Sequence, residues 1–381
     1  MENLKLLFPE LETLPHHDTL TRVLDRIEDL SQIESIQIEL VRDLMRKKKF
    51  EHYLIDGCYP IASRGTQKMV RKLPWSEDCL ERRVGAEEEK KKQYYVYVLE
   101  LNLVFENGMV IPLMSEFLEY RKGDTAEEKQ DSEARGFFRL AKRLKEAFPR
   151  TRFLVLLDGL YANGPVIERC RNYNWQFMIV LQDGSLPYVW EEYRGLKKLL
   201  GKEDRLENTW ADRKQKLHWV NDIDYPFGSN RGKKETVHVV VCEESWEEVD
   251  AQTQKILTRR SRHVWLSSEP LDRCNVVPRC NQGARHRWGI ESAILVEKRC
   301  GYHYEHCFSY SWNAMKGYHY LMRIAHLLNV LVLAAVQLSA IVGTLGARGF
   351  IRFIRQTLSG PWLDAQEVRR RLAVPTYLRF A

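Results

Sequence analysis

Two short apolar segments, each ending in an aspartate and a glycine, constrain most strongly how this chain can fold. The first, residues 50–55, leads to Asp56, and the second, residues 152–157, leads to Asp158. Short apolar runs bounded by glycine are typical of buried strands. An acid at the end of a strand is well placed for chemistry. For either aspartate taken alone, an ordinary turn acid is the alternative interpretation.

The segments around these two strands predict an alternating α/β arrangement. The Asn107-Gly108 pair separates two apolar runs and predicts a hairpin. The expected order is strand, hairpin, helix, strand, helix, strand, preceded by two short helices. The ranges expected are helices at 18–30 and 33–49, a hairpin of 94–105 and 109–113, a helix at 126–148, a helix at 165–173 and a strand at 176–181.

A third acid lies in the stretch from Arg285 to Lys298. If this stretch is helical, Arg287, Glu291 and Lys298 fall on one face, with the carboxylate between two cations. A surface salt-bridge face is the ordinary alternative, and it weakens when the two strand-ending aspartates are considered together with it. Three such carboxylates could hold two divalent cations, since Mg²⁺ prefers oxygen ligands. Two ions held in this way can support phosphoryl transfer.

The composition favours an anionic partner, although modestly. The 381 residues carry 59 basic and 52 acidic side chains, for a formal net charge of +7. Residues 344–381 hold seven arginines and only two acids, which is typical of a nucleic-acid contact. The eight cysteines follow no disulfide framework and fit reduced thiols in a cytosol. We expect no export signal at the start of the chain, and a buried helix rather than a membrane span at 324–343.

These patterns resemble the DDE transposases of bacterial insertion sequences, in the branch whose RNase H-like core is interrupted by inserted β-strands. The resemblance covers residues 14–333 and rests on 54–57, on 156–162 and on the stretch around Glu291. In that family the corresponding helix carries Tyr, Arg, Glu and Lys at the spacing that Arg287, Glu291 and Lys298 show here. Ala284 stands where the family has its Tyr, so the backbone contact of that Tyr is missing here.

The resemblance implies an α/β protein with an RNase H-like core, meaning a mixed sheet flanked by helices, and a β-rich insertion before the last catalytic helix. It makes Asp56, Asp158 and Glu291 the ligands of two Mg²⁺ or Mn²⁺ ions. The implied DNA contacts come from Arg285, Arg287 and Lys298, and from an inserted aromatic, Trp210 or Trp219, that stacks on an extruded base. A tryptophan among strands is more often part of a core. The expected domains are a helical segment 1–49, core 50–181, β-rich insertion 182–284, core helices 285–343 and basic tail 344–381.

The implied function is metal-dependent cutting and joining of DNA at the ends of a mobile element. The implied partners are the terminal inverted repeats, target DNA and a second copy of the chain, with no membrane, in a bacterial cytoplasm at the nucleoid. A DNA-binding protein descended from such an element but no longer catalytic is one alternative, and the presence of all three acids argues against it. A nuclease that cuts without joining is the other.

Overall fold

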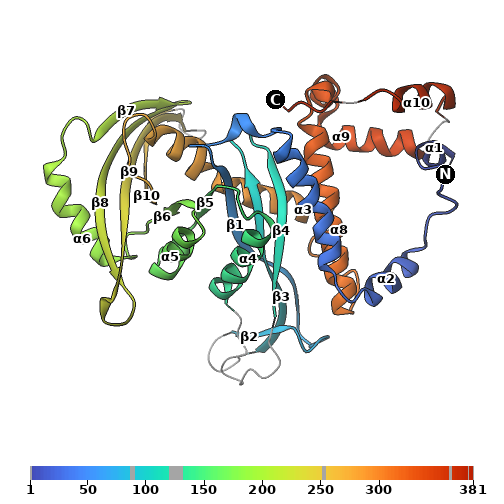
Figure 1. Ribbon diagram of the computed structural model, residues 1–381, viewed down its shortest axis with the longest axis horizontal. Coiled ribbons are helices and arrows are strands. Elements are labelled where there is room, and N and C mark those ends of the chain that lie inside the picture. The colour runs from blue at the N-terminus through green and yellow to red at the C-terminus, as the bar shows by residue number, and fades with distance from the viewer. Residues whose placement is uncertain are drawn as a thin grey trace.

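A mixed β-sheet of ten strands forms the centre of the molecule (Figure 1). The computed structural model describes residues 2–85, 91–119, 132–250, 255–359, 363–375 and 377–380. The strand order is β2-β3-β1-β5-β6-β10-β9-β8-β7, and β4 pairs with β3. The strands are β1 Tyr59–Arg71, β2 Leu80–Val84, β3 Lys91–Val104, β4 Val110–Leu118, β5 Phe153–Leu157, β6 Gln176–Val180, β7 Arg205–Trp210, β8 Arg213–Phe227, β9 Lys233–Val249 and β10 Ile256–Ser267.

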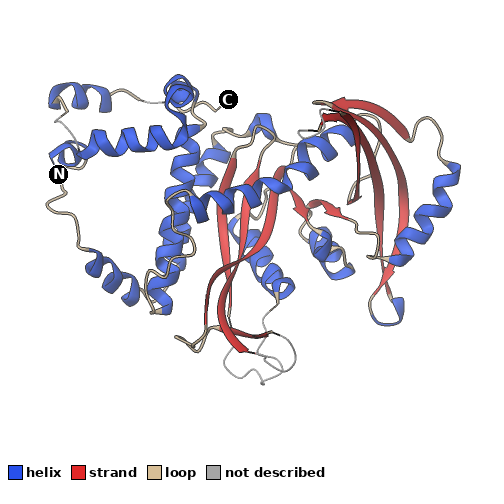
Figure 2. Ribbon diagram, turned by 180° about the vertical axis from the view of Figure 1, so that it is seen from behind, coloured by secondary structure: helices blue, strands red, loops and turns tan. Residues whose placement is uncertain are grey.

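Helices cover both faces of this sheet. On one face α4 and α5 lie in front of the strands in Figure 1, and α7 crosses the other face, which is seen from behind in Figure 2. The α-helices are α1 Glu2–Leu7, α2 His17–Arg26, α3 Ser31–Arg46, α4 Glu133–Ala147, α5 Gly164–Asn172, α6 Pro187–Leu196, α7 Gly289–Arg299, α8 Trp312–Leu333, α9 Ser339–Ser359 and α10 Ala365–Leu372. The mixed α/β class expected from the sequence is therefore observed, whereas an RNase H-like core remains a prediction.

Local sequence signals account for several of these elements. The β3–β4 hairpin turns at Gly108, whose φ of +83° favours glycine, while the side chain of Asn107 accepts a hydrogen bond from the Met109 backbone N–H. Helix α5 begins after Asn163, whose side chain caps the backbone N–H of Val166. The hairpin, β5, α5 and β6 are confirmed close to their expected bounds. Helix α4 begins at Glu133, and the expected helical residues 126–131 lie outside the described part of the chain.

The strand expected at residues 50–55 is wrong. Residues 51–53 form a single 3₁₀ turn, and the first strand of the core, β1, begins only at Tyr59. Asp56 and the following glycine both have positive φ, and Ile55 and Cys58 exchange backbone hydrogen bonds of 3.0 and 2.9 Å across them. Asp56 therefore occupies a tight turn ahead of β1 instead of the end of a strand. Local hydrophobicity predicted the wrong segment because β1 carries charged and polar residues at several positions.

The β-rich stretch after β6 extends the same sheet. Strand β10 pairs antiparallel with β6, with Trp265 opposite Val180, and β9, β8 and β7 follow outward. These strands form the curved region at the left of Figure 1, where α6 packs against β8. Residues 182–284, expected to be a β-rich insertion, contain β7 to β10. The domain boundaries drawn from the sequence remain predictions.

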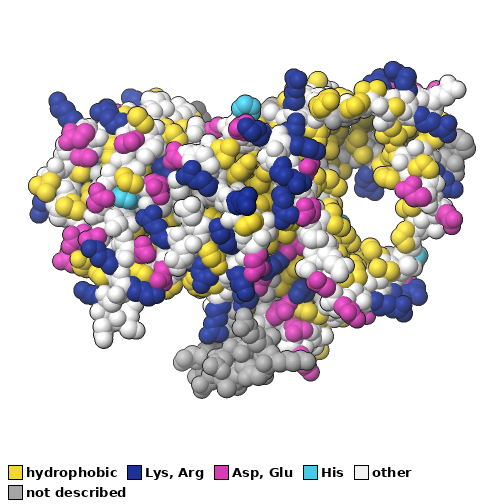
Figure 3. All heavy atoms as spheres, viewed as in Figure 1, with side chains coloured by type: hydrophobic (Ala, Val, Ile, Leu, Met, Phe, Trp, Pro, Cys, Tyr) yellow, Lys and Arg dark blue, Asp and Glu magenta, His cyan; other side chains and the backbone are white. Residues whose placement is uncertain are grey.

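The C-terminal part, expected to be a basic tail, contains α9 and α10 in its described residues. Hydrophobic side chains gather over α9 in Figure 3. Ile341, Leu345 and Phe353 of this helix are exposed. Helix α9 is kinked at Gly346, which has a φ of +66°. Within the described ranges, we find no helix with the length and apolar character that crossing a bilayer requires.

Candidate nucleic-acid interface

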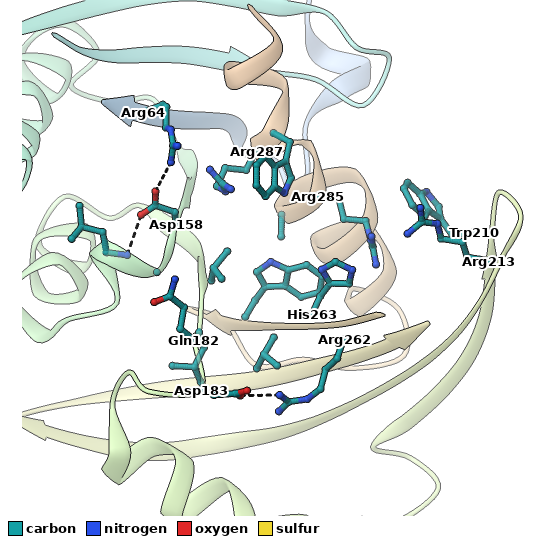
Figure 4. A pocket seen from close by; sticks show the side chains of 18 residues that line it. Arg64, Asp158, Gln182, Asp183, Trp210, Arg213, Arg262, His263, Arg285 and Arg287 are labelled. Carbon is teal, nitrogen blue, oxygen red and sulfur yellow. Dashed lines mark hydrogen bonds and ion pairs between the residues drawn. The ribbon is translucent and has the colours of Figure 1, made fainter. Parts of the chain in front are cut away.

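Asp158 and Glu291 share a partner, Arg64, at one edge of the sheet. Asp158 directly follows β5, and its Oδ1 accepts a hydrogen bond of 3.0 Å from the backbone N–H of Leu160. Glu291 lies in the first turn of α7. The guanidinium of Arg64 lies 3.0 Å from Asp158 Oδ2 and 3.7 Å from Glu291 Oε1 (Figure 4 shows the Asp158 contact). One arginine thus contacts both of these acids.

The register of the sheet explains why Arg64, Asp158 and Glu291 lie close together. Strands β1 and β5 are parallel, and Ala62 lies opposite Leu156. Arg64 and Asp158 each follow that pair by two residues, so both side chains project from the same face of the sheet. Helix α7 packs on this face through a core that contains Ala62, Leu156 and Ile290. The helix therefore carries Glu291 to the place where Arg64 and Asp158 meet.

Asp56 lies at the opposite end of these strands. It precedes β1, whereas Asp158 follows the parallel strand β5, five residues beyond Phe153, the partner of Tyr59. At about 3.3 Å per residue, the strand separates the two ends by roughly 17 Å. The side chain of Asp56 instead pairs with the buried Arg279 at 2.7 Å. The expectation that Asp56 joins the other two acids is therefore not met, because Asp56 lies before its strand instead of after it.

The residues at this edge do not fit a pair of divalent cations. Such ions need several converging oxygen ligands. Where the structure describes the chain, no group of three or more His, Cys, Asp or Glu side chains is placed to hold a metal ion. The two acids that do meet have a guanidinium between them. The site's charge balance comes from an arginine of the chain itself.

A cavity of about 900 Å³ opens beside Asp158 and is rich in cationic and aromatic side chains. Its walls combine five arginines and three tryptophans with only two aspartates (Figure 4). Guanidinium groups recognise phosphate, and tryptophan rings stack on bases. The cavity thus has the chemistry of a nucleic-acid contact. These residues are Arg64, Arg213, Arg262, Arg285, Arg287, Trp210, Trp265, Trp288, Asp158 and Asp183.

A buried carboxylate, Glu244 on β9, fixes part of the cavity wall. It pairs with Arg285 and, at 3.1 Å, with Arg213, and it accepts a 2.6 Å hydrogen bond from Gln215. Burial raises the pKa of Glu244, but the Gln215 hydrogen bond and the Arg285 charge together bring that pKa below its ordinary value. The ionised Glu244 holds Arg285 4.6 Å from the ring centroid of Trp210. Glu244 is therefore a positioning residue for the cationic wall.

His263 adds an uncharged ring to the same wall. Burial, followed by the nearby charge of Arg285, lowers the pKa of His263. The imidazole is therefore neutral near pH 7. It stacks on Trp265 with the ring centroids 5.6 Å apart and an angle of 9° between the planes. Together the two rings give the cavity an extended aromatic surface.

The other residues predicted to contact DNA have different positions. Arg285 and Trp210 line the cavity. Arg287 also lines it, but it is largely buried and pairs with Glu291 at 3.3 Å. Lys298 lies further along α7, pairs with Glu305 at 2.8 Å and does not line the cavity. Trp219 is only 1% exposed within the core beneath α7, so the prediction that it contacts DNA is wrong for the chain as folded.

Two residues of this site, Arg64 and Glu244, were not predicted from the sequence. Arg64 was not predicted because β1 was not recognised as a strand. An arginine within a run of branched and small residues is nevertheless a weak signal of a charged partner on a neighbouring strand. Glu244 follows another glutamate and resembles a solvent-exposed pair. Only the pairing of β9 with β8 and β10 places it inside the protein.

Comparison with known proteins gives a distant structural likeness. No family model matches the sequence, and no curated protein matches it. The structure is similar to that of a piggyBac transposase in a synaptic complex with hairpin DNA, with a TM-score of 0.40 and 9% sequence identity. The match covers 99% of this chain and 78% of that chain. A likeness this distant does not establish a family for this chain.

Proposed function

We propose that this chain is a transposase-type DNA-binding protein that holds DNA in the arginine-lined cavity without a metal-dependent reaction at Asp158 and Glu291. The observation that carries this proposal is Arg64, which contacts both acids where a metal ion would have to bind. The sequence alone favoured an active enzyme because all three acids are present. The separation of Asp56 from the other two reverses that preference.

The charges of the cavity support binding of a phosphate backbone. Its five arginines outnumber its two aspartates, and Arg64 neutralises part of the negative charge of Asp158. Contacts of this kind release counterions from DNA and make affinity fall with salt. Trp210 and Trp288 offer rings for stacking. Through the resemblance to insertion-sequence transposases, the proposal also includes several finer features. These are an RNase H-like core, terminal inverted repeats and target DNA as ligands, synapsis by two copies of the chain, and a location at the bacterial nucleoid.

Salt-dependent DNA binding tests the proposal. Fluorescence anisotropy with labelled duplex DNA should show a steep, linear fall of log affinity with log salt concentration. Arg262→Ala should weaken binding by about threefold to tenfold and reduce the salt slope by about one. Arg262 suits this test because it lines the cavity and its pair with Asp183 is exposed, while its guanidinium also lies 5.2 Å from the ring centroid of Trp190.

Lys142→Ala is the matched control, since Lys142 is an exposed cation on α4 that pairs with Glu146 and does not line the cavity. Its affinity and salt slope should equal those of the wild type. Absence of DNA binding, or equal effects of the Arg262 and Lys142 substitutions, would contradict a DNA site in the cavity.

A second candidate is the metal-dependent transposase itself, with Mg²⁺ or Mn²⁺ as cofactor. The observation that favours it is the convergence of Asp158 and Glu291 on one partner. This candidate requires Arg64 to leave both acids when DNA binds. Incubation with terminal-repeat DNA and Mg²⁺ or Mn²⁺ separates the two: nicking that Asp158→Asn abolishes supports the enzyme. Joining of the cut end to a target plasmid would then exclude a simple nuclease.

A further inference from the structure

We propose that the guanidinium of Arg64 takes the place of a divalent cation between Asp158 and Glu291, so that an acid at position 64 converts this edge of the sheet into a divalent-cation site. This inference deepens the proposed function and rests on it, because it explains how a transposase-type site is charge-balanced by the protein itself. The contacts of 3.0 Å to Asp158 and 3.7 Å to Glu291 place one positive group between two carboxylates.

The strand register determines where a side chain at position 64 must project. Position 64 and Asp158 lie on adjacent parallel strands, two residues beyond the Ala62–Leu156 pair. Neighbouring strands are about 4.8 Å apart, so a carboxylate at position 64 would lie beside that of Asp158 on the same face. Glu291 approaches from α7 above that face. Three carboxylates would then converge, which is the ligand set that hard divalent cations take, with water completing the shell.

The site is open enough for the exchange. The side chain of Arg64 is 39% exposed, and those of Asp158 and Glu291 are 21% and 27% exposed. Arg64 is partly exposed, so its replacement should disturb the core little. In the wild type, a cation would have to displace a guanidinium that is covalently tethered to the strand and already paired. We therefore expect wild-type affinity for divalent cations at this edge to be very low.

The test is direct binding of Mn²⁺, without DNA, to the full chain. Isothermal titration and the paramagnetic resonance signal of free Mn²⁺ would compare the wild type with Arg64→Asp. The Arg64→Asp variant should bind one or two Mn²⁺ ions at least about tenfold more tightly than the wild type. Adding Asp158→Asn to that variant should return binding to the wild-type level, because it removes the adjacent ligand.

Lys142→Asp is the matched control. It makes the same change of charge at an exposed position on α4 that pairs with Glu146 and does not line the cavity. Its Mn²⁺ affinity should equal that of the wild type. Equal affinities of the Arg64→Asp and Lys142→Asp variants, or Arg64→Asp binding that survives Asp158→Asn, would overturn the inference. So would tight, Asp158-dependent binding by the wild type.

The inference can still be tested if the Arg64→Asp variant fails to fold. Circular dichroism and thermal unfolding report whether each variant folds, and Arg64→Asn supplies a neutral oxygen ligand of the same size as aspartate. That variant should also bind Mn²⁺ more tightly than the wild type, and no gain would overturn the inference. Failure of the proposed function is distinguishable, because that function predicts DNA binding by the wild type in the presence of a chelator.

Discussion

Helix α7 carries two glutamates into two very different charge clusters. Glu291, at its start, contacts Arg64 and Arg287 beside the open cavity, and its side chain is 27% exposed. Glu297, six residues later, is fully buried and pairs with Arg323 at 2.8 Å and His326 at 2.7 Å. We call the second cluster the buried charge network; its members are Glu100, Glu297, His319, Arg323 and His326.

The difference in burial gives the two charge clusters different roles: the buried charge network anchors α7, and the charges at the cavity are available for binding. In the buried network, burial raises the pKa of Glu297, but the charge of Arg323 together with the hydrogen bond and charge of His326 leaves that pKa below its ordinary value. The network joins α7 and α8 to β3 inside the protein, so it fixes the orientation of α7. At the cavity the charges are partly solvated and can exchange partners. A rigid anchor at one end of the helix thus supports an adaptable contact at the other.

The largest expected effect comes from breaking the buried network. Glu297→Ala should lower the free energy of unfolding by about 3–5 kcal/mol, because it leaves the buried charge of Arg323 without one of its two carboxylates. Urea unfolding followed by circular dichroism measures this loss. Glu291→Ala is the internal control and should cost less than about 1 kcal/mol. Similar losses for the two variants would erase the proposed distinction.

A pH effect of intermediate size should arise from His319 in the buried network. Burial lowers the pKa of His319 below 6.5, so the unfolded chain takes up this proton more readily than the folded one. The contribution to stability is therefore present above about pH 6.5 and is lost as pH falls, by up to about 1.4 kcal/mol per pH unit.

His319→Gln should remove this part of the slope. Urea unfolding between about pH 7 and pH 5 would compare the two proteins, since most carboxylates titrate below that range. The wild type should lose more stability than the variant over the interval. An identical slope in both proteins would show that His319 is not the titrating group.

A smaller effect, on binding and not on stability, should follow from Trp210→Ala in the cavity. Loss of a stacking ring should weaken DNA binding by about 1–2 kcal/mol, as measured by anisotropy. The free energy of unfolding should change little because Trp210 is only partly buried. Leu199→Ala, which shortens a side chain that is 79% exposed and outside the cavity, should leave the affinity unchanged.

The smallest expected effect is a gain in affinity for DNA. Glu291→Gln removes one negative charge beside Arg64 and Arg287 and should tighten DNA binding about twofold to threefold at low salt, with the gain shrinking as salt screens the charges. Stability should stay within about 1 kcal/mol of the wild type. Weaker binding would instead indicate that Glu291 orients Arg287, and it would favour a role for the acid in holding the ligand.

Several parts of the fold and site could be predicted from local patterns. The β3–β4 hairpin follows from Asn107-Gly108, α5 from its N-terminal cap and proline, and β5 from its apolar run. The stretch around Glu291 was expected to be helical, and α7 forms from Gly289 onward. These succeed because turn conformations, caps and short-range periodicity depend on residues near each other in sequence.

The residues themselves determined the hairpin, the order of β5, α5 and β6, and the presence of Glu291 on a helix. Only the tertiary structure decided that Asp56 lies at the far end of its strand, that Trp219 is core, and that Arg64 meets Asp158 across 94 positions. The physical reason is register. Which side chains share an edge of a sheet depends on where strands begin and how they pair, and a shift of a few residues moves an acid from one edge to the other.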